Sequence, residues 1–183
     1  MTEGAKDYTE TNGRVVLNES SQLDSCEEPK DHAEAKRYGV GTTVGVFDLF
    51  HVGHLNLLER AKECCDFLRV GVITDEVVQV FKGFTPVIPF EQRARIVRAI
   101  HCVDEVVPID DDRLLSKVEQ WYQQPFDCVF SGDDHEGDEF WVEEERVLAQ
   151  LGVDVVYLPY TDTISSTKIR GALRAKGAES DRR

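Results

Sequence analysis

The sequence predicts an α/β protein in which a Rossmann-like, doubly wound parallel sheet forms a single domain. From about residue 40 onwards, short apolar runs typical of buried strands alternate with stretches of helical period. The chain has 183 residues and is 41% hydrophobic, which suits one domain with one core. Together these observations favour strand–helix alternation over an all-α or all-β fold.

Residues 1–36 differ from the rest of the chain in composition. They are rich in Glu, Asp, Ser, Thr and Lys, and Val15–Leu17 is their only apolar cluster. A segment of this kind buries too little apolar surface to form a core. We expect a flexible, acidic N-terminal tail, with a helical turn at most near residues 31–36, followed by the folded domain over residues 37–183.

A strand–turn–helix unit at residues 44–65 organises the domain. Residues 44–47 are Val-Gly-Val-Phe, an uncharged run that suits a strand covered on both faces. From Leu55 to Cys65 apolar residues recur at intervals of three or four, which predicts an amphipathic helix. The turn therefore joins the carboxyl end of a strand to the amino end of a helix, where open α/β sheets bind ligands.

This turn carries two histidines, His51 and His54, with Gly53 between them and Asp48 just upstream. Free N–H groups and the helix dipole favour anions here, and two imidazoles can face one phosphate. Gly53 allows a ligand to approach the backbone closely. Such a histidine pair also occurs by chance, caps helices or contributes to metal sites, although no Cys or carboxylate lies at ligand spacing within the turn. The whole pattern favours a phosphate site.

Strand-like apolar runs and helical spacing of apolar residues also predict each remaining element. Runs rich in β-branched and aromatic residues predict strands at residues 67–75, 103–108, 128–132 and 153–158. Helical spacing predicts a short helix from residue 76, helices over 89–100, 114–123 and 139–151, and a final helix from residue 164. In the helix that Pro89 opens, the expected inward stripe is Ile96, Val97 and Ile100.

Composition and motifs exclude several classes of protein. The net charge of −14 argues against a general nucleic-acid binder, which needs a basic face. The chain has no Gly-x-x-x-x-Gly-Lys-Ser/Thr loop, so it is not a P-loop enzyme. The glycines of residues 38–45 precede and enter a strand, whereas those of a dinucleotide fingerprint open a helix.

The cysteines and the lengths of the apolar runs indicate where in the cell the protein is located. Five cysteines form no Cys-x-x-Cys pair, as expected for reduced and mostly buried thiols. No apolar stretch approaches 18 residues and no hydrophobic signal segment is present. We expect a cytoplasmic protein that does not insert into membranes.

A second anion site is predicted where the last helix begins. Ser165, Ser166 and Thr167 offer hydroxyls and unpaired N–H groups, and Lys168 or Arg170 can add positive charge. Taken alone, this cluster fits an ordinary helix cap. However, this helix start and the histidine turn both follow strands and so share one edge of the sheet. A triphosphate can stretch between two such helix ends.

Other polar side chains can complete this site. Lys82 lies in a mobile-looking loop and could close over phosphates, although a solvated surface lysine is nearly as good an interpretation. Arg93 and Lys117 are weaker candidates, because such helix residues are usually solvated. Asp133 and Asp134 could hold a ribose or Mg²⁺, or could form an acidic turn.

The residues present indicate phosphate chemistry without a covalent intermediate. No Ser-Gly elbow or poised cysteine is found. An attacking phosphate ester has a second pKa of about 6, so it is ionised at neutral pH and needs no strong general base. The reaction then needs alignment and neutralisation of charge on the attacked phosphorus. Two histidines, a lysine, helix amino termini and Mg²⁺ would supply both.

From Gly41 to about Leu173 the chain resembles the cytidylyltransferase family, and most of all the bacterial glycerol-3-phosphate cytidylyltransferases. Five blocks agree with the family in order and spacing: residues 46–54, 74–76, 103–106, 132–134 and 164–169. The resemblance implies transfer of CMP from CTP to a small phosphate monoester, favouring glycerol 3-phosphate, with release of pyrophosphate. It also implies Mg²⁺ and a homodimer.

The resemblance assigns roles to particular residues. His51, His54 and Lys82 would be catalytic, with both histidines stabilising the transferring phosphate. The nucleotide would be bound by Val46, Phe47, Asp48, Gly53, Gly132, Asp133, Thr161, Ile164, Ser165, Ser166 and Thr167. The second substrate would be contacted by Lys117, Asp75 and Arg93. No protein ligand of a metal is assigned.

Departures from the family pattern leave two alternatives open. Residues 160–163 are Tyr-Thr-Asp-Thr where the family has Arg-Thr-x-Gly, whose arginine contacts the nucleotide. His135 replaces a tryptophan, and a single lysine, Lys82, stands beside Phe84 where the family has several lysines. Residues 164–170 are also similar to the closing motif of nicotinamide mononucleotide adenylyltransferases. The chain could therefore be an adenylyltransferase that uses ATP and another acceptor, or an inactive nucleotide-binding regulatory module.

Overall fold

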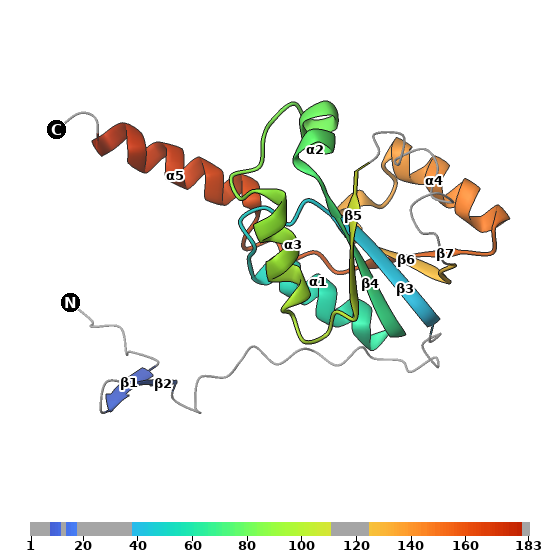
Figure 1. The fold of residues 1–183 in the computed structure, drawn as a ribbon, viewed down its shortest axis with the longest axis horizontal. Helices are drawn as coiled ribbons and strands as arrows, with labels where there is room; N and C mark the ends of the chain where they lie inside the picture. The colour runs from blue at the N-terminus through green and yellow to red at the C-terminus, as the bar shows by residue number, and fades with distance from the viewer. Residues whose placement is uncertain (1–7, 12–13, 18–37, 111–124, 181–183) are drawn as a thin grey trace. The chain divides into compact units, whose positions relative to one another are not determined.

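The computed structural model describes residues 8–11, 14–17, 38–110 and 125–180. The chain divides into two compact units, Met1–Ala35 and Lys36–Arg183. The second unit contains a five-stranded sheet with helices on both faces (Figure 1). No helix in these ranges is long and apolar enough to cross a membrane.

The first unit contains a short antiparallel hairpin. Its strands are β1 (Tyr8–Thr11) and β2 (Arg14–Leu17), with Tyr8 opposite Leu17. The apolar cluster noted in the sequence is thus one strand of a hairpin, which composition does not predict because strand pairing depends on the partner segment. The helical turn considered near residues 31–36 lies outside the described residues.

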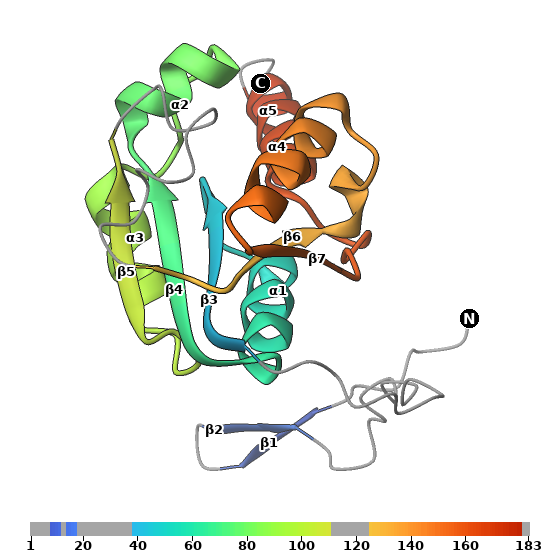
Figure 2. The ribbon, with the colours of Figure 1, turned by 90° about the vertical axis from the view of Figure 1, so that its right-hand side faces the viewer.

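The sheet of the second unit is parallel throughout, as predicted. Its order is β5-β4-β3-β6-β7, and Figure 2 shows the strands side by side. The strand bounds are β3 (Tyr38–Gly45), β4 (Cys65–Ile73), β5 (Glu105–Ile109), β6 (Cys128–Gly132) and β7 (Asp154–Leu158). The central strand β3 pairs with β4 on one side and β6 on the other, so the winding of the chain reverses beside β3. Ligands of doubly wound sheets bind at this reversal.

Helices cover both faces of the sheet. Helices α1 (Val52–Glu63) and α3 (Phe90–Arg98) lie on one face, and α4 (Glu139–Gln150) lies on the other (Figure 1). The larger apolar core includes Leu58 of α1, Val70 of β4 and Phe130 of β6. A smaller cluster under α4 includes Val129 and Leu148. Strands covered in this way explain the nearly continuous apolar runs in the sequence.

The first strand of the sheet lies earlier in the chain than predicted. It covers the glycine-rich segment Tyr38–Gly45, so Val46 and Phe47 lie beyond its end. A Cβ atom at Gly41 would lie 2.3 Å from Cε2 of Phe130 and 2.9 Å from Sγ of Cys65. Glycine is therefore needed where large side chains of the neighbouring strands cross the central strand.

Three helices also differ in detail from their prediction. Helix α1 begins at Val52 rather than Leu55, and α2 (Asp75–Lys82) includes Lys82, so the prediction of a loop at Lys82 was wrong. Ile96 of α3 is exposed, because that helix turns Arg93, Ala94 and Val97 inward. The last helix, α5, covers Ser166–Ser180. The helix expected at residues 114–123 lies outside the described residues.

Candidate active site

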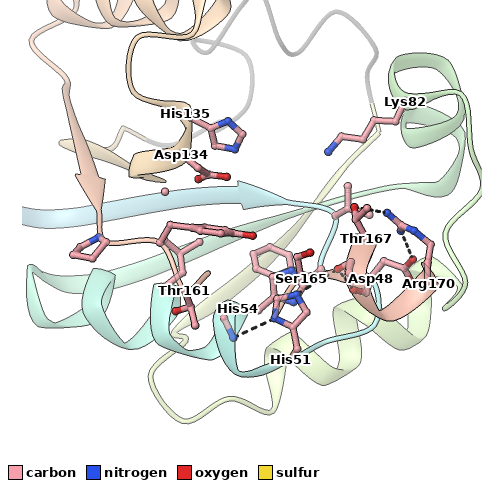
Figure 3. A pocket seen from close by; sticks show the side chains of 18 of the residues that line it. Asp48, His51, His54, Lys82, Asp134, His135, Thr161, Ser165, Thr167 and Arg170 are labelled. Carbon is pink, nitrogen blue, oxygen red and sulfur yellow. Dashed lines mark hydrogen bonds and ion pairs between the residues drawn. The ribbon is translucent and has the colours of Figure 1, made fainter. Parts of the chain in front are cut away.

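A pocket lies at the carboxyl ends of β3, β6 and β7 (Figure 3). It brings together most of the candidate residues from the sequence, in the turn after β3, at the end of α2, after β6 and β7, and at the start of α5. These are Val46, Phe47, Asp48, His51, Gly53, His54, Lys82, Gly132, Thr161, Ser165, Ser166 and Thr167. Two helix amino termini, those of α1 and α5, therefore meet at one cavity.

The turn that leads from β3 into α1 has an unusual backbone. Phe47 and Leu49 adopt φ values of 52° and 51°, in the left-handed region that residues with side chains rarely occupy. Each such residue costs on the order of 1–3 kcal/mol, which the surrounding contacts must offset. One of these contacts is the hydrogen bond that the Arg93 guanidinium donates to the carbonyl oxygen of Val46. Asp48 lies between these two residues, and its side chain is buried inside the protein.

Asp48 joins three segments that are far apart in the chain. Its carboxylate accepts hydrogen bonds from the backbone N–H groups of Val87 at 3.1 Å and Ile88 at 3.0 Å. It also pairs with Nη1 of Arg170 at 3.2 Å, while its carbonyl oxygen accepts the hydroxyl of Ser166 at 2.6 Å. The side chain is only 1% exposed. Asp48 lines the pocket, but the protein occupies its carboxylate, so it positions its neighbours rather than offering a free ligand group.

His51 caps helix α1 with its side chain. Nδ1 accepts the N–H of Gly53 at 3.1 Å, so in the neutral ring the proton lies on Nε2. Nε2 is 3.5 Å from Oγ of Ser166, at the start of α5. A Cβ atom at Gly53 would lie 3.0 Å from ring atoms of His51, so glycine leaves the imidazole room to cap. The ring is thereby fixed with its N–H directed toward the second helix start.

His54 stacks on His51, with ring centroids 3.9 Å apart and an interplanar angle of 20°. The rings of Phe47 and Phe50 lie 5.3 and 5.4 Å from it. Burial, and then the nearby His51, lower the pKa of His54 to about 4. Burial also lowers the pKa of His51. His54 is thus neutral at pH 7 and offers an N–H donor, while its buried Nδ1 has no hydrogen-bond partner among the described residues.

The lowered pKa of His54 predicts how stability depends on pH. Between pH 6.5 and about 4 the unfolded chain takes up a proton at His54 and the folded protein does not, so the free energy of unfolding falls as pH falls. The loss from His54 amounts to about 2–3 kcal/mol across that window. Urea unfolding of the wild type and His54→Asn at pH 7.5, 6 and 5 would measure it. Equal losses in both proteins would contradict the prediction.

The start of α5 forms the second half of the site. Oγ of Ser165 accepts the N–H of Lys168 at 3.2 Å and so caps the helix. The sequence left open whether Lys168 or Arg170 adds charge here. The Lys168 ammonium donates to the carbonyl oxygen of Asp162 and does not line the pocket, whereas Arg170 does line it. Arg170 is the cation of this helix start.

Lys82 and His135 point into the pocket from the side opposite the histidine pair (Figure 3). Lys82 is the last residue of α2, and its side chain is partly open to solvent. Surrounding protein, and then the charge of Arg170, lower the pKa of its ammonium group. Asp134 and His135 belong to the short 3₁₀ helix η3 (Asp133–His135) that follows β6. Groups on both sides of the pocket can therefore contact one anion.

Some predicted residues lie outside the pocket. Asp133 does not line it, and its Oδ1 accepts the N–H of Tyr160 at 2.9 Å, which ties together the segments after β6 and β7. Ile164 does not line the pocket either, although its carbonyl oxygen lies 3.6 Å from where a Cβ atom on Gly53 would be. Lys117 falls outside the described residues.

Arg93 and Asp75 form a structural pair beneath the site. The Arg93 side chain is fully buried, and its guanidinium donates to Asp75 at 2.5 Å and to the carbonyl oxygens of Val46, Ile73 and Ile88. Oδ2 of Asp75 in turn accepts the N–H of Phe90. Neither side chain lines the pocket. The geometry corrects the expectation that Arg93 contacts a second substrate, because its side chain is fully buried and does not line the pocket.

Comparison with known proteins identifies the family of this chain. A family model described as cytidylyltransferase-like matches residues 42–172, which include every pocket residue named above. The chain belongs to the cytidylyltransferase-like family. Glycerol-3-phosphate cytidylyltransferase of Bacillus subtilis (strain 168) is 38% identical over 128 residues, covering 70% of this chain and 92% of that protein. The chain is therefore a nucleotidyltransferase.

The chain is also similar to a second curated protein and to a solved structure. FAD synthase of Pyrococcus abyssi (strain GE5 / Orsay) is 39% identical over 116 residues, covering 63% of this chain and 77% of that protein. The crystal structure of a lipopolysaccharide core biosynthesis protein from Thermoplasma volcanium GSS1 aligns with a TM-score of 0.56 and 26% identity. That alignment covers 68% of this chain and 99% of the other, and it confirms the predicted fold.

Sequence reasoning missed Leu57 and Pro159, which also line the pocket. Leu57 belongs to the apolar stripe of α1, and a sequence does not distinguish an apolar residue that packs in the core from one that contacts a ligand. Pro159 follows β7, and its carbonyl oxygen accepts a 2.5 Å hydrogen bond from Arg60 of α1. Nearby, the side-chain amide of Asn56 donates to Oγ1 of Thr161 at 3.0 Å. These contacts fix one wall of the pocket through pairs about 100 residues apart.

Proposed function

We propose that this enzyme transfers CMP from CTP to a small phosphate monoester, with glycerol 3-phosphate as the favoured acceptor, and releases pyrophosphate. The observation that carries the proposal is the meeting of two helix amino termini at one pocket. One presents His51 and His54, and the other presents Ser165–Thr167 and Arg170. Support for the choice of substrates comes from the relative named glycerol-3-phosphate cytidylyltransferase, nearly all of which this chain covers.

The chemistry requires alignment and charge neutralisation. An oxygen of the ionised acceptor phosphate attacks the α-phosphorus of the nucleotide, and the bond from that phosphorus to the bridging oxygen breaks as pyrophosphate leaves. Neutral His54 donates a hydrogen bond to the oxygens that gain charge. Arg170, Lys82 and the N–H groups of the α5 start neutralise the departing phosphates. No proton has to be removed from the acceptor, because it is already ionised.

Mg²⁺ is part of this proposal. The described residues contain no group of three or more His, Cys, Asp or Glu side chains placed to hold a metal ion. Mg²⁺ commonly takes one or two carboxylates together with phosphate oxygens and water. Asp134, an exposed carboxylate of the pocket, is the residue that fits such a role. When bound, the ion would neutralise charge on the phosphates.

A second candidate activity uses ATP in place of CTP. Tyr160 lines the pocket where the family pattern has an arginine that contacts the nucleotide. The similarity of residues 164–170 to the closing motif of the adenylyltransferases points the same way. The segment Tyr160–Thr163 would then select the base.

The test is pyrophosphate release with Mg²⁺, comparing CTP and ATP, each with glycerol 3-phosphate and a panel of small phosphate esters. We expect release with CTP and glycerol 3-phosphate to exceed every other pair. A preference for ATP would replace the proposed nucleotide. Nucleotide binding without turnover for any pair would favour the regulatory module.

The proposed homodimer and cytoplasmic location are separate expectations. Light scattering coupled to size-exclusion chromatography measures the mass of the purified protein in solution. A mass of one chain, about 20.7 kDa, would contradict the dimer. Fractionation of cells that express the full chain would test the location.

A further inference from the structure

An aromatic ring lies against the cation of the second helix start. The centroid of the Phe84 ring is 4.5 Å from Cζ of Arg170, well within the range of a cation–π contact. Both side chains line the pocket. Phe84 lies in the loop after α2, where the family pattern has further lysines. At this position the chain thus presents an apolar ring to a guanidinium rather than another positive charge.

Arg170 makes two polar contacts with side chains of the site, and both are long. Nη1 is 3.2 Å from Oδ2 of Asp48 and Nη2 is 3.4 Å from Oγ1 of Thr167. Charge-assisted hydrogen bonds that fix a guanidinium firmly are shorter, about 2.7–2.9 Å. The face of the Phe84 ring, with its centroid 4.5 Å from Cζ of Arg170, adds a third contact that holds the guanidinium.

The position of Phe84 is fixed by the segments on either side of it in the chain. Gly83 caps the end of helix α2, and its φ of 66° turns the chain out of the helix. Beyond Phe84, the backbone N–H groups of Val87 and Ile88 bind the Asp48 carboxylate. The same carboxylate therefore anchors both the loop that carries the ring and the cation that the ring contacts.

We propose that Phe84 is a positioning residue that holds the Arg170 guanidinium toward the triphosphate. A ring contacts the face of a guanidinium and leaves the N–H groups at its edge free for phosphate oxygens. A second carboxylate would instead compete for those N–H groups and cancel the charge. This inference rests on the proposed function only in taking a nucleoside triphosphate as the ligand.

The test compares three variants by the binding of CTP and of ATP, measured by calorimetry on the full chain. Phe84→Leu removes the ring, Phe84→Tyr keeps it, and Phe81→Leu removes an exposed ring of α2 that does not line the pocket. We expect Phe84→Leu to weaken binding of the accepted triphosphate about 5-fold, the scale of one partly exposed cation–π contact. Phe84→Tyr and Phe81→Leu should stay within about 2-fold of the wild type. Wild-type affinity in Phe84→Leu would overturn the proposal.

A second measurement, NMR spectroscopy of the wild-type protein, requires neither enzymatic turnover nor a substituted protein. In wild-type protein, the ring current of Phe84 should shift the NMR signals of the Arg170 side chain upfield of the other arginines that lack ring contacts. Ordinary arginine shifts at Arg170 would reject the contact. Because both readouts are independent of catalysis, lack of CMP transfer would count against the proposed function alone.

A double variant separates positioning from a loss of local structure. If Phe84 acts through Arg170, adding Phe84→Leu to Arg170→Gln should not weaken binding further. Additive losses would show that Phe84 acts through another group. Thermal unfolding of each variant checks that the comparison is made between folded proteins.

Discussion

Replacing His54 with alanine is expected to lower turnover at least about 100-fold while the protein stays folded. Removing one preorganised hydrogen-bond donor from a transition state has an effect of this size. The structure adds a reason: the rings of His51, Phe47 and Phe50 surround His54 and keep it neutral, so its N–H is directed before substrate arrives. Pyrophosphate release under saturating substrates measures the loss.

A matched control comes from another histidine of the same domain. His101 is exposed in the turn that follows α3, and it does not line the pocket. His101→Ala should keep turnover within about 2-fold of the wild type, since surface changes away from a site have small effects. Far-ultraviolet circular dichroism would confirm the fold of both variants. Turnover of His54→Ala equal to that of His101→Ala would remove His54 from the mechanism.

Arg93→Met is expected to have the largest effect on stability, lowering the free energy of unfolding by about 3 kcal/mol or more. The change leaves Asp75 without its partner and removes hydrogen bonds from three carbonyl oxygens beneath the site. One of these belongs to Val46, at the entry to the strained turn, so activity should fall together with stability. Urea unfolding measures the free energy, and its midpoint should fall without a change in slope.

Arg95→Met supplies the control on the same helix. Arg95 is exposed, two residues from Arg93, and its replacement should change stability by less than about 0.5 kcal/mol. The comparison also separates the structural role of Arg93 from the substrate contact that the sequence suggested. A substrate contact alone predicts a raised KM for the acceptor with unchanged stability. That result would contradict the buried arrangement.

The histidine turn was predictable because it is a local pattern. A strand, His51-x-Gly53-His54 and a helical period follow one another within about 20 residues, and strand–helix alternation places such turns on one edge of a parallel sheet. The hydroxyl cluster Ser165–Thr167 was predictable for the same reason. Structure confirms that both helix starts line one pocket.

Residues whose role depends on distant segments were not predictable. In the sequence, Arg93 and Lys117 both appear to be positively charged residues on a helix surface. In the structure Arg93 is buried beneath the pocket, where it donates hydrogen bonds to carbonyl oxygens of three other segments. Lys82 and Arg170 converge on the pocket because α2 and α5 end and begin beside it. Sequence spacing carries no information about contacts between elements that lie 20 to 120 residues apart.

By itself, the sequence determined the alternation of elements, the parallel sheet and the two helix starts that we propose bind anions, because each follows from a local period or cap. Tertiary structure decided which charges are free to act. In the folded protein Asp48 joins the Val87–Ile88 loop to α5, and Arg93 is buried in the interior. Phe84 lies against Arg170. The physical reason is that burial and pairing determine what a charged side chain can do, and both are set by segments far away in the chain.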